Sequence, residues 1–243
     1  MLKKLALGIV CVGLSTVTLH AAAPASDNAG NYADTAAWIT GSNGGTGFGA
    51  WTITDGNGSH YIGGTGLGAR TFGLFNTLTD PQITTEAVRP MTGTLLAGET
   101  FSIDLGFTAF SSGSIGVNLR SGTEEVITLF TNGTGDWMLN DGGGNFSAGS
   151  VATANTPYTF TFTYNGTNSY SFSLTGGPGG PNFTSSDPLI GSIDNIRLFN
   201  FNQGAGQNFG FDNIAIVPEP SSVALLVGPA LLGAWFFVRR RRA

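Results

Sequence analysis

Alternation of apolar and polar residues with a period of two is the main pattern along this chain. Every second residue is apolar from Phe101 to Phe107, and the run from Tyr158 to Tyr164 repeats the pattern with four aromatic side chains. A third alternating run, Tyr170 to Leu174, follows Asn165-Gly166, a pair typical of tight hairpin turns. We therefore predict three strands whose inward face carries Phe101, Ile103, Leu105, Phe107, Phe160 and Phe162.

Shorter runs of the same kind predict further strands over residues 51–54, 71–75, 115–119, 126–130, 196–199 and 211–217. Clusters of turn-forming residues at 131–135 and 141–145 separate some of them. Many short strands without a convincing amphipathic helix predict an all-β protein, an antiparallel β-sandwich. One short helix is expected within residues 28–38, with Asn31 or Asp34 as its N-cap.

Both ends of the chain differ from this pattern. Residues 1–23 have a basic start, an apolar stretch and small residues at 21–23, the order of a secretory signal peptide. At the other end, Pro218-Glu219-Pro220 precedes an apolar run over 223–238 and the cluster Arg239, Arg240, Arg241 and Arg242. Such a run spans about 24 Å as a helix, and the arginines resist translocation. We expect a precursor anchored in the inner membrane by this single helix, with the passenger, residues 24–217, outside the cytoplasm.

The tail closely resembles the PEP-CTERM sorting signal in its Pro-Glu-Pro triplet, short apolar helix and terminal arginine cluster. The resemblance covers residues 218–243 and implies processing by an exosortase near Pro218–Pro220, after a signal peptidase has removed the leader. It also implies release to the cell surface or an extracellular matrix of exopolysaccharide. The glycine-rich segment from Gly41 to Trp51 is similar to segments of other proteins that carry such tails.

Charge and cysteine content narrow the function of the passenger. Its basic residues are Arg70, Arg89, Arg120 and Arg197, against fourteen acidic residues, so its net charge is near −10. A surface of this sign repels phosphate backbones, which argues against nucleic acid as a partner. No cysteine remains after residue 11, so the fold depends on its hydrophobic core or on bound ions.

The pair Asp-Asn occurs twice near the end of the passenger, at 194–195 and 212–213, each time before an isoleucine. The second pair, in the last predicted strand, resembles the closing strand of jelly-roll carbohydrate-binding modules and concanavalin A-like lectin domains. That resemblance implies a structural calcium ion at Asp212. The alternative is that Asp-Asn only turns the chain into the strand.

Asp55, Asn57 and Ser59 place oxygen-bearing side chains at alternate positions, as in the opening of an EF-type calcium loop. His60 stands where that loop has glycine, and Gly66 stands where it ends in glutamate. A glycine-rich turn therefore remains the alternative. Calcium is the one cofactor for which the sequence offers candidate ligands.

The sequence offers little for catalysis. His60 is the single histidine of the passenger, no cysteine is present as a nucleophile, and the motif Gly-x-Ser-x-Gly is absent. Glu124 and Glu125 are adjacent and would point to opposite faces of a strand, whereas Asp104 has no glutamate two residues away. We expect no enzyme; a glycan hydrolase would need acids brought together from distant strands.

Aromatic residues beside polar loops are the candidates for sugar binding. Trp51 and Trp137, the latter next to Asp136, could stack on pyranose rings; the alternative is that they belong to the core. Three functions therefore compete. We favour a structural or adhesive matrix protein that associates with exopolysaccharide, over a calcium-assisted lectin-like module and a glycan hydrolase.

Overall fold

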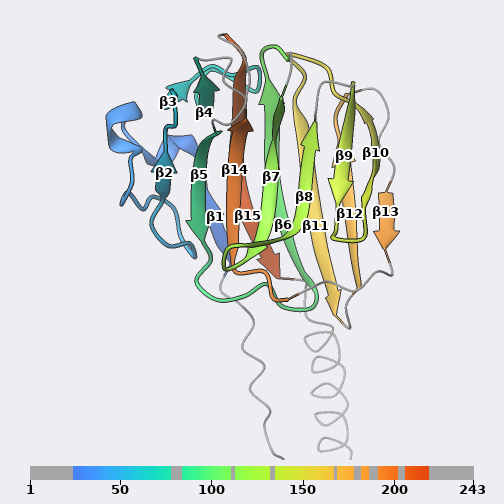
Figure 1. Ribbon diagram of the computed structural model, residues 1–243. Coiled ribbons are helices and arrows are strands. Elements are labelled where there is room, and N and C mark those ends of the chain that lie inside the picture. The colour runs from blue at the N-terminus through green and yellow to red at the C-terminus, as the bar shows by residue number, and fades with distance from the viewer. Residues whose placement is uncertain are drawn as a thin grey trace, which may run out of the picture.

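Two antiparallel β-sheets pack face to face in the computed structural model of the protein (Figure 1). The structure describes residues 24–77, 84–110, 113–131, 135–166, 169–177, 182–185, 191–201 and 206–218. The predicted signal peptide and residues 219–243, with Glu219, Pro220 and the arginine cluster, lie outside the described residues, whereas Pro218 ends the last strand. Within these ranges, no helix has the length and apolar character needed to cross a membrane.

The first sheet holds eight of the described strands. Seven follow one path, in the order β13 (Asn182–Ser185), β12 (Ser169–Thr175), β11 (Tyr158–Gly166), β6 (Glu99–Phe107), β15 (Asn208–Pro218), β4 (Thr71–Asn76) and β3 (Gly58–Gly63). The eighth, β1 (Ala25–Asp27), pairs with the second half of β15, while β4 pairs with the first half. A long β15 thus joins the N-terminal segment to the centre of the sheet.

The second sheet holds seven described strands. Their order is β10 (Asn145–Val151), β9 (Asp136–Asn140), β8 (Glu124–Thr131), β7 (Ser114–Ser121), β14 (Asn195–Phe201), β5 (Thr84–Pro90) and β2 (Thr52–Thr54). All strand pairings in the described part of both sheets are antiparallel, including the β11–β12 hairpin predicted from Asn165-Gly166. The predicted antiparallel sandwich is therefore confirmed.

The core lies between the two sheets and is formed by the side chains that the alternation predicted. Phe101, Ile103, Leu105 and Phe107 of β6 and Phe160 and Phe162 of β11 are each at most 1% exposed. The intervening residues of β6 and β11 face outward, so the register predicted for both strands is correct.

The predicted short helix over residues 28–38 is replaced by two 3₁₀ turns, η1 (Ala29–Asn31) and η2 (Thr35–Ala37). Asp34 caps η2, because its carboxylate accepts a bond from the Ala37 amide at 3.1 Å. Asn28 caps η1, and Asn31 lies inside that turn, so Asn31 is not a cap. Gly30 within this stretch disfavours a continuous α-helix.

A buried polar cluster, the Arg89 cluster, holds the N-terminal segment against β5. Arg89 is fully buried; it forms an ion pair with Asp27 and donates to Tyr32 at 3.1 Å and to Asn43 at 2.8 Å. Burial lowers the pKa of Arg89 to about 10, which leaves the guanidinium charged at neutral pH. Asp27 also accepts a bond from the Tyr32 hydroxyl at 2.8 Å, so its carboxylate is well satisfied.

The glycine-rich segment 41–51 surrounds this cluster. The carbonyls of Gly44 and Gly49 accept bonds from Arg89 at 2.6 and 3.1 Å, and the Trp51 indole donates to Tyr32 at 2.8 Å. Gly45 has a φ of 72°, and a Cβ there would overlap the backbone carbonyl of Ser26. Glycine is required at this position because the segment lies directly on β1.

Candidate functional site

A row of glycines on the outer face of the first sheet lets a loop lie flat on that face. Gly73 of β4 and Gly106 of β6 are both register partners of Gly210 in β15. The side chains of Tyr61, Thr65 and Leu67 occupy the space above Gly73, Gly210 and Gly106, respectively, where an added Cβ would overlap them. The loop between β3 and β4, residues 64–70, is thereby fixed across three strands.

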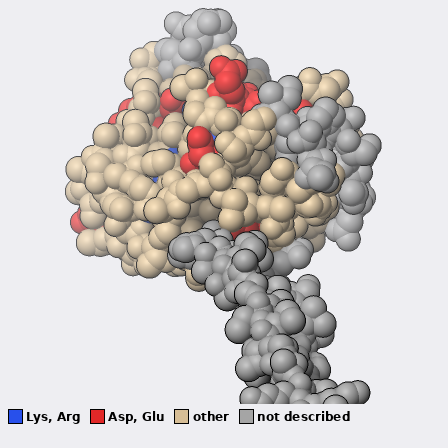
Figure 2. All heavy atoms as spheres, turned by 90° about the horizontal axis from the view of Figure 1, so that it is seen from below, with Lys and Arg blue, Asp and Glu red and all other residues tan. Residues whose placement is uncertain are grey.

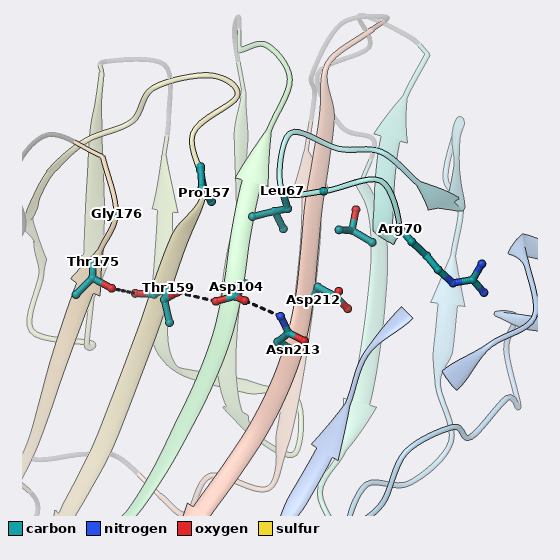
Figure 3. Close-up of a pocket in the computed structure, with 11 residues that line it drawn as sticks. Leu67, Arg70, Asp104, Pro157, Thr159, Thr175, Gly176, Asp212 and Asn213 are labelled. Atoms are coloured by element: carbon teal, nitrogen blue, oxygen red, sulfur yellow. Dashed lines mark hydrogen bonds between the residues drawn. The ribbon is translucent and has the colours of Figure 1, made fainter. Parts of the chain in front are cut away.

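The next row along the sheet carries polar side chains. In register, Thr175 of β12 pairs with Thr159 of β11, Thr159 with Asp104 of β6, and Asp104 with Asp212 of β15. These four residues form the floor of a groove of about 300 Å³ across the outer face (Figure 3). The β3–β4 loop with Leu67 and the segment before β11 with Pro157 also line the groove.

Asp104 accepts hydrogen bonds from two other side chains of the groove, Thr159 and Asn213. One carboxylate oxygen accepts a bond from the Thr159 hydroxyl at 2.6 Å, and the other accepts one from the Asn213 side-chain amide at 2.7 Å. Asn213 reaches Asp104 because β15 has a bulge between Asp212 and Ala215, where Asn213 adopts a φ of 49°. Asparagine tolerates this left-handed backbone better than most residues.

Asp212 has a different environment from Asp104. One of its oxygens accepts a bond from the Ala29 amide at 2.8 Å, which links the groove to η1 and the Arg89 cluster. Burial raises the pKa of Asp212 and the charge of Asp104 raises it further, against the effect of the Ala29 and Asn213 amides. The groove thus places two acids side by side, and the fold disfavours ionisation of one of them.

Arg70, which also lines the groove, does not neutralise this pair. Figure 3 shows the Arg70 side chain turned away from Asp104 and Asp212. Its guanidinium donates instead to backbone carbonyls of η1 and the following residues, including Ala33 at 2.8 Å. The floor therefore presents hydroxyl groups and carboxylates, which suit a ligand that is rich in hydroxyl groups.

The predicted calcium ligands do not come together in the described part of the chain. Asp55 contacts His60, with its carboxylate 2.6 Å from the ring nitrogen Nδ1, and its carbonyl accepts a bond from Gly58 that closes a turn. Ser59 donates weakly to the His60 carbonyl at 3.4 Å, and Asn57 is exposed. Asp212 belongs to the groove, and no group of three His, Cys, Asp or Glu residues is arranged for a metal among the described residues. Residues 55–58 form a glycine-rich turn that leads into β3, as in the alternative given above.

The predicted role of Trp51 and Trp137 in sugar stacking is wrong, because both indoles are buried. Trp51 is 1% exposed and packs edge-on against Trp38, with ring centroids 5.7 Å apart. Trp137 is fully buried and packs against Tyr158 at 5.5 Å. Asp136 is exposed at the start of β9, in the second sheet, and does not line the groove.

Asp104 and Asp212 were each visible in the sequence, but their pairing was not. Asp104 alternates with inward-facing residues of β6, which predicts an outward carboxylate, and Asp212 begins the closing Asp-Asn pair. Their juxtaposition depends on the β6–β15 register, which neither strand specifies alone.

No family model matches the chain, and no curated protein matches it in sequence.

Among solved structures, a sialidase superimposes with a TM-score of 0.53 at 12% identity over 71% of this chain. The match covers only 17% of the sialidase, so this chain corresponds to a small part of that protein. A protein of unknown function from Shewanella oneidensis MR-1 gives 0.49 at 12% identity, over 86% of this chain and 97% of that one. A galectin from Caenorhabditis elegans gives 0.35 at 22% identity, over 58% and 94%. The sialidase match shows a shared β-sandwich fold.

Proposed function

We propose that this protein is an exported, non-catalytic glycan-binding module, of jelly-roll and lectin-like type, that serves a structural or adhesive role at the cell surface. The observation that carries the proposal is the outer-face groove, whose floor is the row Thr175, Thr159, Asp104 and Asp212. Carboxylates and hydroxyls accept and donate the hydrogen bonds that sugar hydroxyls need, and preformed concave sites suit small ligands.

The charge of the groove selects the type of glycan. Asp104 and Asp212 would repel an acidic polymer, and the passenger as a whole is near −10. The groove therefore favours a neutral polysaccharide segment held by hydrogen bonds, with Leu67 and Pro157 in contact with its apolar faces. Binding of this kind depends little on salt, since charge attraction contributes little to it.

The proposal of export depends on the two ends of the chain. Residues 1–23 have the order of a signal peptide, and residues 218–243 resemble a PEP-CTERM signal that an exosortase would process. We propose a membrane-anchored precursor that is released to the cell surface or to an exopolysaccharide matrix. The exposed groove is compatible with this destination, since its ligand would be the surrounding polymer.

A glycan hydrolase is the second candidate, and one observation favours it. The fold raises the pKa of Asp212 beside Asp104, as general acids beside a second carboxylate require. Register neighbours have Cβ atoms about 4.5–5.5 Å apart, so the two carboxyl groups are neighbours, and glycoside hydrolysis uses a pair of neighbouring carboxyl groups. Asp104, however, already accepts bonds from Thr159 and Asn213, which makes it a poor nucleophile and favours binding over hydrolysis.

Affinity electrophoresis of the passenger through gels that contain neutral or acidic polysaccharides tests the proposal. We expect retardation by a neutral polymer that persists at high salt and in the presence of a chelator. Loss of retardation with chelator would indicate a calcium-assisted lectin instead. Release of new reducing ends, abolished by Asp212→Asn, would indicate a hydrolase, and no retardation by any polymer would remove the glycan-binding function.

A further inference from the structure

The groove opens on one side onto a regular array of polar side chains, the hydroxyl array. Strands β12, β11 and β6 lie side by side, and each contributes three outward residues to it. In register, the array has three rows of three, which are Thr175, Thr159 and Asp104, then Ser173, Thr161 and Ser102, then Ser171, Thr163 and Thr100. The first row belongs to the floor of the groove, so the array and the groove are one continuous surface.

The second and third rows lie on the side of the groove that the β3–β4 loop does not border. This loop covers the glycine row on the other side of the floor, where Leu67 lies above Gly106. Along β6, Asp104 separates Gly106 from Ser102. A ligand in the groove therefore has the loop on one side and the second and third rows on the other.

Cross-strand bonds hold several hydroxyl groups of the array in place. The hydroxyl oxygens of Thr161 and Ser173 are 2.7 Å apart, and those of Thr163 and Thr100 are also 2.7 Å apart. Each pair uses one of its two hydroxyl hydrogens for this bond, which leaves the second hydrogen and further lone pairs for a ligand. Side chains that are ordered before binding lose less entropy on binding, so the array is preorganised.

The array is almost uncharged. Of its nine residues only Asp104 is charged, although the passenger carries fourteen acidic and four basic residues. On β15, Ala215 and Val217 border the second and third rows, and Val217 is 53% exposed. Figure 2, which looks onto the end where β15 finishes, shows mostly uncharged side chains there. A neutral sugar suits this face, because threonine presents a methyl group beside its hydroxyl, as sugars present CH groups beside theirs.

We propose that the hydroxyl array is a binding face for a packed neutral polysaccharide, in which several chains lie side by side. Rows are about 7 Å apart along the strands and strands are about 4.8 Å apart, so the array covers about 13 Å by about 10 Å. A single chain that followed one row or one strand would leave most of the array uncovered, whereas packed chains cover all of it. This inference rests on the proposed glycan-binding function and specifies the state of the polymer.

Partition onto insoluble polysaccharides tests the proposal. The full-length chain in lipid nanodiscs is mixed with powders of cellulose, curdlan or mannan, and separately with the matching soluble trisaccharide, which is short enough to lie within the groove. The test variant carries Thr161→Val with Thr163→Val, which removes two hydroxyls outside the groove and keeps the size of both side chains. The matched control carries Thr52→Val with Thr54→Val, two exposed threonines at the same spacing on β2 of the second sheet.

We expect the test variant to bind the powder at least about tenfold more weakly than the wild type, since each lost hydrogen bond weakens binding several-fold. Its affinity for the trisaccharide should stay within about twofold, because the groove is intact. The control should match the wild type with both ligands. Ser102→Ala with Ser173→Ala gives the same comparison if the threonine variant does not fold.

Equal binding of the powder by the wild type and the test variant would overturn the proposal. Binding of a trisaccharide without binding of any powder would also overturn it, and in both cases the groove would remain a glycan site. If no powder and no trisaccharide binds, the glycan-binding function fails together with this inference. Disulfide-linked dimers of Ser102→Cys, in a Cys11→Ser background, would overturn the proposal as well, since they would show that a second copy covers the array.

Discussion

At the scale of single residues, the Arg89 cluster has the greatest consequence for the fold. The cluster explains why segment 41–51 is rich in glycine, since its backbone carbonyls must approach Arg89 closely. The sequence pattern predicts no role for Arg89, because a buried arginine interrupts the apolar alternation of its strand. β5 was missed for the same reason, since Thr85, Ala87 and Arg89 are its inward residues.

Replacing Arg89 tests this role. Arg89→Met should lower the free energy of unfolding by about 3–5 kcal/mol, because it leaves the Asp27 carboxylate buried without its partner. Arg120→Met is the control, since Arg120 lies nearer the surface and bonds the Thr123 carbonyl; its effect should stay within about 0.5 kcal/mol. Urea titrations of both variants give the comparison, and equal stability would show that the cluster contributes little.

Asp212 gives the protein a predictable dependence on pH. Its pKa in the folded state is raised above the ordinary 3.8, so folding favours the protonated carboxyl and stability falls as pH rises through the folded pKa. Asp212→Asn carries no charge and should therefore have a higher Tm than the wild type at pH 7. The difference should disappear below pH 3.8, where both proteins are uncharged at this position.

Asp136→Asn is the matched control, because it removes one negative charge at an exposed position of β9. It should change Tm much less than Asp212→Asn at pH 7. A lower Tm for Asp212→Asn than for the wild type at pH 7 would contradict the account, since the Ala29 bond would then outweigh the cost of burial.

At the scale of strands, those with strict apolar–polar alternation were predicted from the sequence, whereas those with interrupted alternation were missed. β6 and β11 were identified with the correct inward face, and β12 was located as a strand, because each repeats apolar residues at period two. β3 and β10 were missed, since their sequences consist mainly of glycine, small and polar residues and lack a regular alternation of large apolar residues. Trp137 shows the opposite error: it alternates with Leu139, which indicates the core, but its polar neighbour Asp136 suggested a ligand face.

A pair of adjacent substitutions in β6 tests the register. Ile103→Asp should destabilise the protein by several kcal/mol, about the cost of an unpaired charge in a full core. Ser102→Asp should be tolerated, because Ser102 faces outward between Thr161 and Ala215. Thermal unfolding of the two variants suffices; comparable stability would mean that the strand faces are misassigned.

At the scale of the whole molecule, the groove lies on the outer face of the first sheet, and its floor comes from four strands of that sheet, β12, β11, β6 and β15. The sequence predicted the sandwich, because core alternation determines layers. The groove could not be predicted, because its acids come from strands more than one hundred residues apart and meet only through pairing.

Processing at the tail is the prediction at this scale. In cells that contain the sorting enzyme, the mature protein should end near Pro218–Pro220 and lack the apolar run and the arginine cluster. Mass spectrometry of the C-terminal peptide measures this directly, with cells that lack the enzyme as the control. Recovery of only the intact arginine-rich terminus, from cells with the enzyme as well as from cells without it, would contradict the proposal.

The central claim is that the groove binds a glycan. It is tested most directly by the affinity of two threonine variants for the neutral polysaccharide that retards the protein in affinity electrophoresis. Thr159 lies in the groove and donates to Asp104, whereas Thr128 has a similar half-buried place on the second sheet and bonds Asn118. Calorimetry should show that Thr159→Val raises Kd about tenfold, a loss of about 1.4 kcal/mol, and that Thr128→Val changes Kd by less than about twofold. Equal affinities for the two folded variants would contradict the assignment of the groove as the glycan site.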